Sequence, residues 1–207
     1  MPDLNKIYLF RMTHIENISH ILRFGITHRN SENANPNYVP IGDGSLITSR
    51  NSKLLPNGKR LGDYIPFYFG VRTPMLIVMQ KGWNGINATD AANIVYCITS
   101  VQQMINHNLD FIFSNGHANS DLSDFFTSSD IINVETIVDF DATKVKWWNS
   151  ETDTDLKRRK EAEFLVGEDI PYSAIRGYVV FNEKAKSDLV KLNIDKNIII
   201  VNQNYYF

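Results

Sequence analysis

Residues 7–25 of this 207-residue chain have the sequence IYLFRMTHIENISHILRFG, which combines the signals for a strand and for a helix. Ile7–Phe10 is a short apolar and aromatic run, typical of a buried strand. Thr13 and Glu16 have the spacing of a capping box, in which each side chain satisfies the other residue's backbone N–H. Apolar residues then recur on one helical face: Ile15, Ile18, Ile21 and Leu22. Gly25 is suited to end this helix in a left-handed conformation.

The rest of the chain alternates between short strands, helices and loops. Strands are predicted from β-rich apolar runs at residues 64–69, 75–79, 94–98, 110–113, 162–166, 175–181 and 197–201. Helices are predicted at residues 100–106 and 183–192. Residues 28–63 are rich in Asn, Ser, Gly and Pro and are expected to be mostly loop, with one extended stretch at Ser45–Thr48. Residues 115–135 suggest a loop and a short helix. The sum is a single α+β domain over residues 1–207, with a mostly β core.

Composition excludes several classes of protein. A content of 43% hydrophobic residues is enough for one substantial core, and a net charge of -2 indicates no bulk attraction to nucleic acid. A DNA-binding surface must therefore be local. Cys97 is the only cysteine, so no intramolecular disulfide can form and a multi-thiolate zinc site is excluded. We expect no metal and no membrane span, because no apolar run approaches about 20 residues, and we expect a cytoplasmic protein.

Common nucleotide-binding and hydrolase motifs are missing. Gly42-Asp43-Gly44 supplies two glycines of a dinucleotide fingerprint, but Ile47 stands where the third is required. There is no P-loop, no HExxH helix and no GxSxG elbow. Any NAD bound by this chain is therefore bound outside a Rossmann fold.

Four segments together resemble the DarT family of DNA ADP-ribosyltransferases, which are toxins paired with an antitoxin that contains a macrodomain. The segments are YLFRMTHIEN at 8–17, LITSR at 46–50, LGDYIPFYF at 61–69 leading to Pro74-Met75-Leu76, and RRKEAEFLV at 158–166. Their order and spacing extend the resemblance over most of the chain. It implies an ADP-ribosyltransferase-like split β-sheet core with peripheral helices, and NAD as co-substrate in its cleft.

The resemblance implies that Glu163 and Arg50 are the catalytic residues. Breaking the bond between nicotinamide and ribose develops positive charge on the ribose, which a carboxylate such as that of Glu163 stabilises. Arg50 would orient NAD or the acceptor base through its planar donors, since a permanently charged guanidinium is a poor general base. Spacing alone also fits two ordinary roles. Glu163 would then face water between Ala162 and Phe164, and Arg50 would be a surface residue.

The resemblance also implies an NAD-binding set. Thr13 and His14 are its predicted members near the first strand, although helix capping alone would explain Thr13 and a structural role would explain His14. Further members are aromatic or flexible apolar residues that suit a flat ring: Tyr64, Tyr68 and Met75. Aromatic residues in such a run also commonly belong to the core.

The implied acceptor is a base in single-stranded DNA, which in the most similar branch of the family is thymidine. Asn115–Ala118 resembles a family segment on the substrate side of the cleft. A basic and aromatic region near Glu163 supplies the phosphate-neutralising and stacking groups that single strands require, and we predict these DNA-binding residues: Lys146, Trp147, Trp148, Lys157, Arg158 and Arg159. A run of charge is also commonly just a solvated face.

Two other functions remain open from the sequence. An NAD glycohydrolase or a protein ADP-ribosyltransferase would use the same cleft with another acceptor. A non-catalytic module would bind single strands without turnover. Glu163→Ala separates this non-catalytic module from the main prediction. The change would leave the cellular phenotype of a binding module intact, but it should abolish the toxicity of a transferase. We expect that change to preserve the fold, on the assumption that Glu163 lies at an exposed edge.

Overall fold

The computed structural model describes residues 1–207, which form one eight-stranded sheet in the order β5-β4-β6-β2-β1-β3-β7-β8. The strands are β1 (Tyr8–His14), β2 (Ile65–Tyr68), β3 (Ile94–Ser100), β4 (Phe111–His117), β5 (Phe125–Thr127), β6 (Ala162–Val166), β7 (Gly177–Val180) and β8 (Ile199–Val201). All neighbours are antiparallel except β7 and β8, which are parallel. This architecture confirms the α+β prediction.

In the middle of the sheet, β1 and β2 are paired at a single position. β1 pairs with β3 along its whole length, from Tyr8 opposite Ser100 to His14 opposite Ile94. On its other side β1 meets β2 only at Phe10 opposite Tyr68. The two halves of the sheet therefore diverge from this single contact, as a split sheet requires, and Tyr68 lies at the point of divergence.

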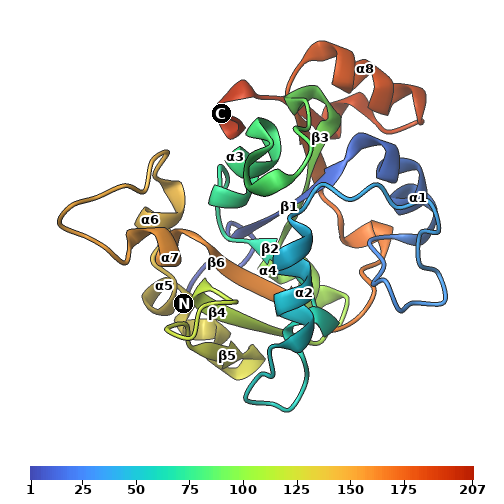
Figure 1. The fold of residues 1–207 in the computed structure, drawn as a ribbon. Helices are drawn as coiled ribbons and strands as arrows, with labels where there is room; N and C mark the ends of the chain where they lie inside the picture. Colours follow the sequence, from blue (N-terminus) through green and yellow to red (C-terminus); the bar gives the residue numbers. More distant parts are fainter.

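Helices surround the sheet (Figure 1). The α-helices are α1 (Ile18–Phe24), α2 (Gly44–Ser52), α3 (Pro74–Lys81), α4 (Val101–Asn106), α5 (Val134–Ile137), α6 (Phe140–Lys144), α7 (Leu156–Lys160) and α8 (Glu183–Lys191). Short 3-10 helices are η1 (Ile15–Asn17), η2 (Leu61–Asp63), η3 (Trp83–Gly85), η4 (Ala91–Asn93), η5 (Ser128–Asn133), η6 (Tyr172–Ala174), η7 (Lys196–Ile198) and η8 (Gln203–Tyr205). None of the helices has the length and apolarity that crossing a bilayer demands.

The largest core cluster, of 29 buried residues, runs through both halves of the sheet. All five residues of β6 are buried, and the Phe164 ring stacks on that of Phe111 at 4.4 Å between centroids. Stacked aromatic pairs stabilise by about 1 kcal/mol beyond their buried area. Glu163 therefore lies on one of the most rigidly packed strands of the molecule.

Most of the predicted elements are confirmed. The strand predicted at 162–166 is β6 with the same bounds, and β1, β2, β3, β4, β7 and β8 overlap their predicted ranges. The helices predicted at 100–106 and 183–192 are α4 and α8. Gly25 follows α1 with φ of 80°, a left-handed value that a side chain would strain.

The strand predicted at 75–79 is wrong, because these residues belong to the helix α3. Pro74 stands at its first turn, where its missing N–H costs nothing, and Gly82 ends it with φ of 67°. A continuous apolar run has no period to separate a buried strand from a buried helix. The flanking Pro and Gly were the signals that distinguish them here.

The extended stretch predicted at Ser45–Thr48 is also wrong, because it lies in α2. The Asp43 carboxylate accepts hydrogen bonds from the Ser45 N–H and hydroxyl and so caps this helix. None of the α2 residues is buried, so the helix shows no apolar periodicity. Similarly, residues 115–135 contain the end of β4, the strand β5 and the 3-10 helix η5, and are more ordered than predicted.

The capping box predicted for Thr13 and Glu16 is not formed. Thr13 is a buried residue of β1 whose hydroxyl accepts a hydrogen bond from the Asn17 amide. His14 caps η1 instead, with its Nδ1 accepting from the Glu16 N–H. The strand extends further than predicted because pairing with β3 provides a backbone partner at every position up to His14.

Candidate active site

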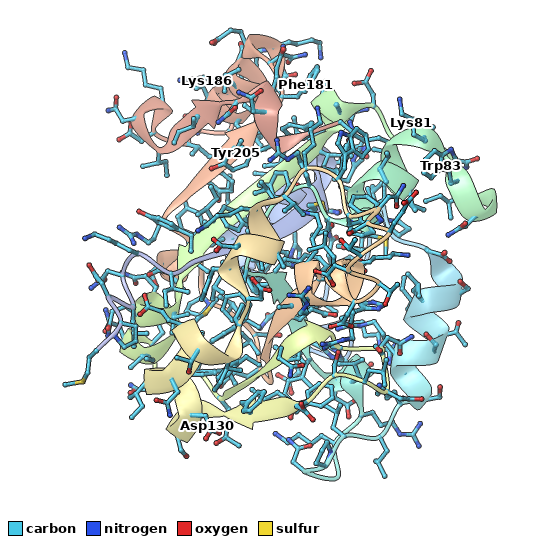
Figure 2. The ribbon with its side chains drawn as sticks, turned by 90° about the vertical axis from the view of Figure 1, so that its left-hand side faces the viewer. Lys81, Trp83, Asp130, Phe181, Lys186 and Tyr205 are labelled. Atoms are coloured by element: carbon cyan, nitrogen blue, oxygen red, sulfur yellow. The ribbon has the colours of Figure 1, made fainter.

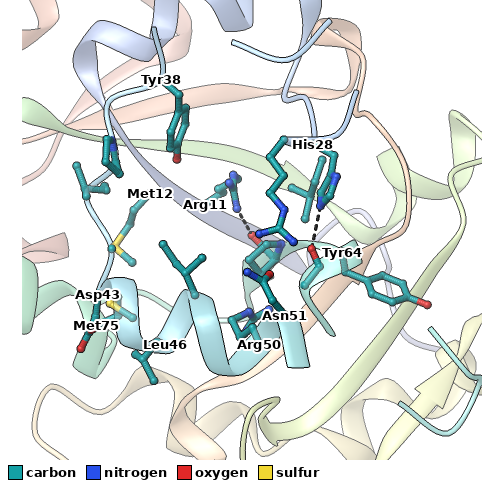
Figure 3. Close-up of a pocket in the computed structure, with 18 of the residues that line it drawn as sticks. Arg11, Met12, His28, Tyr38, Asp43, Leu46, Arg50, Asn51, Tyr64 and Met75 are labelled. Carbon is teal, nitrogen blue, oxygen red and sulfur yellow. Dashed lines mark hydrogen bonds between the residues drawn. The ribbon is translucent and has the colours of Figure 1, made fainter. Parts of the chain in front are cut away.

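A cavity of about 380 Å³ opens where β1 and β2 diverge, and its size is within the usual range for small-molecule sites (Figure 3). Its walls come from β1, the segment between α1 and α2, α2 itself, η2 with β2, α3 and the end of β4. The residues on which the argument depends are Arg11, Arg29, Arg50, Tyr64, Tyr68, Met75 and His117. Four predicted site residues therefore meet in one cavity: Arg50, Tyr64, Tyr68 and Met75.

Glu163 does not itself line the cavity, but it forms an ion pair with Arg50, which does. Arg50 Nη1 lies 2.8 Å from Glu163 Oε2 and 3.2 Å from Oε1. The Ala118 backbone N–H donates to Oε1 at 2.9 Å. The Glu163 side chain has no exposed surface, so the carboxylate is fully removed from water. Residues 113 apart in sequence are thus held in direct contact.

Arg50 also presents an unused donor. Its second terminal nitrogen, Nη2, is buried and makes no hydrogen bond, although Arg50 lines the cavity. A buried donor without a partner costs about 1–3 kcal/mol and calls for an acceptor. An oxygen of a bound ligand is the natural acceptor for Nη2.

Contacts with the β4–β5 loop position α2, which has no buried residue of its own. Asn119 donates to the Ser49 hydroxyl at 2.9 Å. Lys53 donates to the Ser120 carbonyl at 2.8 Å and pairs with Asp121. The same loop supplies the Ala118 N–H to Glu163. One loop therefore sets the positions of both members of the catalytic pair.

The cavity combines positive charge with apolar wall. Arg11, Arg29 and Arg50 line it, and the Arg11 guanidinium is oriented by its bond to the Pro66 carbonyl at 2.9 Å. Apolar side chains form another part of the wall: Met12, Leu46, Met75 and Met79. Such a cavity suits a ligand with an anionic centre and flat rings.

Tyr68 and Tyr64 contribute in different ways. Removal from water, reinforced by the negative charge of Glu163, raises the pKa of Tyr68 well above its ordinary value. Tyr68 therefore remains a phenol that can donate a hydrogen bond. The Tyr64 hydroxyl accepts from the Asn57 amide at 2.8 Å, while its side chain lines the cavity.

His117 lies in the cavity wall and was only weakly indicated by the sequence. Burial lowers its pKa below the ordinary 6.5, with the positive charges of Arg50, Lys157 and Lys53 acting in the same direction and Glu163 opposing them. The imidazole is therefore neutral at pH 7 and able to accept a proton. The segment Asn115–Ala118 was the only signal for it in the sequence.

Thr13 and His14 do not line the main cavity. Thr13 lines a small pocket of about 30 Å³ next to it, and Arg11 and Tyr38 belong to the walls of both. His14 lines neither. Their predicted contact with NAD stays a prediction.

The predicted DNA-binding residues separate into two groups. Arg158 pairs with Asp155 and donates to Asn115 and Ser123, and Arg159 is held by three carboxylates: Asp139, Asp153 and Asp155. These arginines hold α7 and its surroundings together. In contrast, Lys146 and Lys157 are exposed and form no ion pair. Trp147 is exposed, and Trp148 is half-buried.

The chain is similar in sequence to curated DNA ADP-ribosyl transferases. A DNA ADP-ribosyl transferase of Escherichia coli O127:H6 is 28% identical over 196 residues, which is 93% of this chain and 88% of the relative. A DNA ADP-ribosyl transferase–glycohydrolase fusion protein of Thermosipho africanus is 28% identical over 96% of this chain, but this match spans only 49% of the fusion.

Solved structures agree in fold. Thermus sp. 2.9 DarT in complex with ADP-ribosylated ssDNA superposes with a TM-score of 0.85 at 24% identity, covering 100% of this chain and 98% of the other. The same protein in complex with NAD+ gives a TM-score of 0.79. These matches confirm the predicted ADP-ribosyltransferase-like fold. The family model described as ssDNA thymidine ADP-ribosyltransferase, DarT, matches residues 10–207. The resemblance seen in four short segments thus extends over nearly the whole chain, which belongs to the DarT family.

Proposed function

We propose that residues 1–207 act as one domain that transfers ADP-ribose from NAD to thymidine in single-stranded DNA. The observation that carries this proposal is the ion pair between the buried Glu163 and Arg50, because Arg50 lines a cavity whose other walls are cations and flat or flexible side chains. Membership of the family supports the same reaction and acceptor.

Glu163 serves the step in which NAD is cleaved. The bond between nicotinamide and the ribose C1 breaks, nicotinamide leaves with the bonding electrons, and positive charge develops on the ribose. The Glu163 carboxylate stabilises this charge and accepts a hydrogen bond from a ribose hydroxyl. Its hydrogen bonds from Arg50 and from the Ala118 N–H hold the carboxylate in one orientation.

Other cavity residues bind and orient NAD. Arg11 and Arg29, with Nη2 of Arg50, supply donors for the pyrophosphate oxygens. Tyr68 and Met75 flank the nicotinamide, with Tyr64 beside them, because planar and polarisable groups pack well on a flat ring. Thr13 and His14 bind the far part of NAD, beyond the small pocket that adjoins the cavity.

His117 accepts the proton that the acceptor base loses. A thymine base must give up its ring N–H proton when its nitrogen bonds to the ribose carbon. Arg50 cannot take it, because a guanidinium stays protonated at neutral pH. The neutral imidazole of His117 lies in the same cavity wall and has the pKa direction that a general base needs.

His117→Gln is expected to lower kcat/KM for transfer by about a hundredfold or more, the usual contribution of a positioned general base. In the unsubstituted protein, kcat/KM falls as pH drops through the His117 pKa, which lies below 6.5, because the protonated ring cannot accept. The variant should lack this acid limb. The measurement is kcat/KM from pH 5 to 8. His107→Gln, which removes a ring bonded to Ser173, is the control and should retain it. An unchanged acid limb in His117→Gln would assign the base to another group.

Single-stranded DNA reaches the site past Lys157, Lys146, Trp147 and Trp148, with Arg158 and Arg159 shaping α7 beneath them. We place the protein in the cytoplasm, paired with a macrodomain antitoxin. The fusion of a DNA ADP-ribosyl transferase with a glycohydrolase in the Thermosipho africanus relative supports this pairing. Cys97 is free and buried, which suits a reducing compartment.

Intact-mass analysis of oligonucleotides tests the function. The protein is incubated with NAD and with single strands that contain thymine or lack it. One ADP-ribose added only to thymine-containing strands is the expected result. Release of free ADP-ribose without any gain on DNA would favour an NAD glycohydrolase or transfer to protein. Intact NAD and unmodified DNA would favour a binding module without turnover.

A further inference from the structure

Three aromatic rings form a cluster outside the cavity. Trp147 lies 5.3 Å from Phe207 and 6.3 Å from Trp148, and Trp148 meets Phe207 edge-on at 6.0 Å, all between ring centroids. We call these three residues the aromatic platform. Trp147 and Trp148 are adjacent in the sequence, but Phe207 lies far from them. The sequence therefore indicated two members of the aromatic platform and not the third.

Trp147 is the exposed ring of the aromatic platform and has a positive charge beside it, whereas Trp148 and Phe207 are half-buried. Trp147 is 57% exposed, and Lys146 Nζ lies 5.6 Å from its ring centroid. Large aromatic side chains that remain exposed together commonly mark a binding surface. A flat face beside a cation fits a nucleic-acid base beside its phosphate.

Contacts from α3, which forms part of the cavity wall, and from α7, which precedes β6, hold the aromatic platform in place. Gln80 of α3 donates to the Phe207 carbonyl and accepts from the Phe207 N–H, and α3 also carries Met75 of the cavity. Lys160, at the end of α7, donates through its buried Nζ to the Val145 carbonyl. The rings are thus attached to the frame of the active site.

Arg72 adds a direct link between the two parts of the aromatic platform. Its guanidinium donates to the Asn204 carbonyl at 2.8 Å and to the Lys144 carbonyl at 3.3 Å. Arg72 holds φ of 52°, a left-handed value that costs energy in a residue with a side chain. The bridge to both segments stabilises this conformation and fixes Phe207 beside Trp147.

The aromatic platform lies within reach of a strand bound at Glu163. Trp147 is two residues beyond Val145, and Glu163 is three residues beyond Lys160. At most about 18 Å of backbone and one lysine side chain therefore separate them. A few nucleotides span such a distance, and known single-strand sites cover about 4–16 nucleotides.

Stacking outweighs charge at this surface. The two arginines of the basic run, Arg158 and Arg159, are neutralised by aspartates. Lys146 and Lys157 remain to meet phosphates. Aromatic side chains accept any base, so the expected recognition is independent of sequence.

We propose that the aromatic platform stacks a base of the single-stranded DNA substrate, a few nucleotides away from the thymidine that receives ADP-ribose. This inference rests on the proposed function for its ligand. It adds a second contact to DNA, formed by Trp147, Trp148 and Phe207 with Lys146.

Trp147→Ala and Phe207→Ala test the aromatic platform. Each should weaken binding of a 12-nucleotide single strand by about 5- to 100-fold, the range for loss of one stacking side chain. Both hydrogen bonds of Phe207 use its backbone and survive the change to alanine. The loss should be smaller for a thymine-containing trinucleotide, because three nucleotides bound at the cavity do not reach the rings. The binding assay is fluorescence anisotropy of labelled strands without NAD.

Trp83→Ala is the matched control. Trp83 is 53% exposed, nearly as much as Trp147, but it contacts none of the three rings and projects beyond the end of α3 beside Lys81 (Figure 2). Wild-type affinity in all variants, or an equal loss in Trp83→Ala, would overturn the aromatic platform. So would a loss that is the same for the trinucleotide and the 12-nucleotide strand, since that indicates a damaged cavity.

The salt dependence of single-strand binding is a second, independent test of whether stacking or charge holds the DNA at the aromatic platform. Two phosphate contacts, from Lys146 and Lys157, predict a slope of about -1.4 for log K against log salt on a single strand. A steep slope, near that of an arginine-rich groove, would contradict a stacking site. Binding of strands in the absence of NAD is measured here, so failure of the transfer reaction and failure of the aromatic platform are separate results.

Discussion

Glu163→Gln is expected to lower the rate of ADP-ribose transfer by about a hundred- to a thousandfold while leaving the protein folded. The amide has the shape of the carboxylate but no charge, so it cannot stabilise the positive ribose in the transition state. Its single oxygen, placed at the Oε1 position, can still accept the Ala118 N–H and the 3.2 Å bond from Arg50, while the 2.8 Å bond to Oε2 is lost. Transfer to a thymine-containing strand and thermal unfolding are measured together. Activity within tenfold of the original would show that Glu163 is not the catalytic carboxylate.

Glu163→Ala should behave differently and serves as the comparison. The expectation that this position is an exposed edge is wrong, since the side chain is fully buried on a central strand. Alanine leaves the Arg50 charge and the Ala118 N–H without their partner, a loss of about 3–5 kcal/mol for a buried pair. A toxicity test with alanine alone would therefore confuse lost chemistry with lost stability.

Glu161→Gln should make the protein more stable, increasingly so as pH rises. Glu161 is 6% exposed, makes no side-chain hydrogen bond, and burial with the nearby Glu163 charge raises its pKa to about 8. Between pH 4.5 and 8 the unfolded chain releases this proton while the folded chain keeps it, so stability falls as pH rises. The shift corresponds to at most about 5 kcal/mol by pH 9. Glutamine stays neutral and avoids this loss.

Urea unfolding of both proteins at pH 5, 7 and 9 measures the difference. Lys160 next to it has a pKa lowered to about 8 by burial, and it changes stability in the opposite direction only from about pH 8 upwards, so among these three pH values it acts at pH 9. The difference between wild type and Glu161→Gln cancels that contribution, as long as Lys160 is present in both. Parallel curves at the three pH values would show that Glu161 is ionised in the folded protein at neutral pH.

The strands and the contact between Glu163 and Arg50 were predictable for identifiable reasons. β6 is a short, uniformly apolar run around Glu163, so its bounds were predicted without error. Arg50 and Glu163 were identified through segments that resemble the family, and the structure places them in contact. α2 and α3 were missed because a helix without a buried face, or with apolar residues throughout, has no period to read.

By itself the sequence determined the α+β class, most strands and the family, and it predicted the pair of Glu163 and Arg50, because these depend on local pattern and on short motifs. Only the tertiary structure decided which charges are free. Arg158 and Arg159 lie in the basic run but are neutralised by aspartates that include the distant Asp139. It also decided that Glu163 is buried and that Phe207 meets Trp147. Burial, ion pairing and ring contacts depend on residues far apart in the chain, and only the packing of strands, helices and loops brings those residues together.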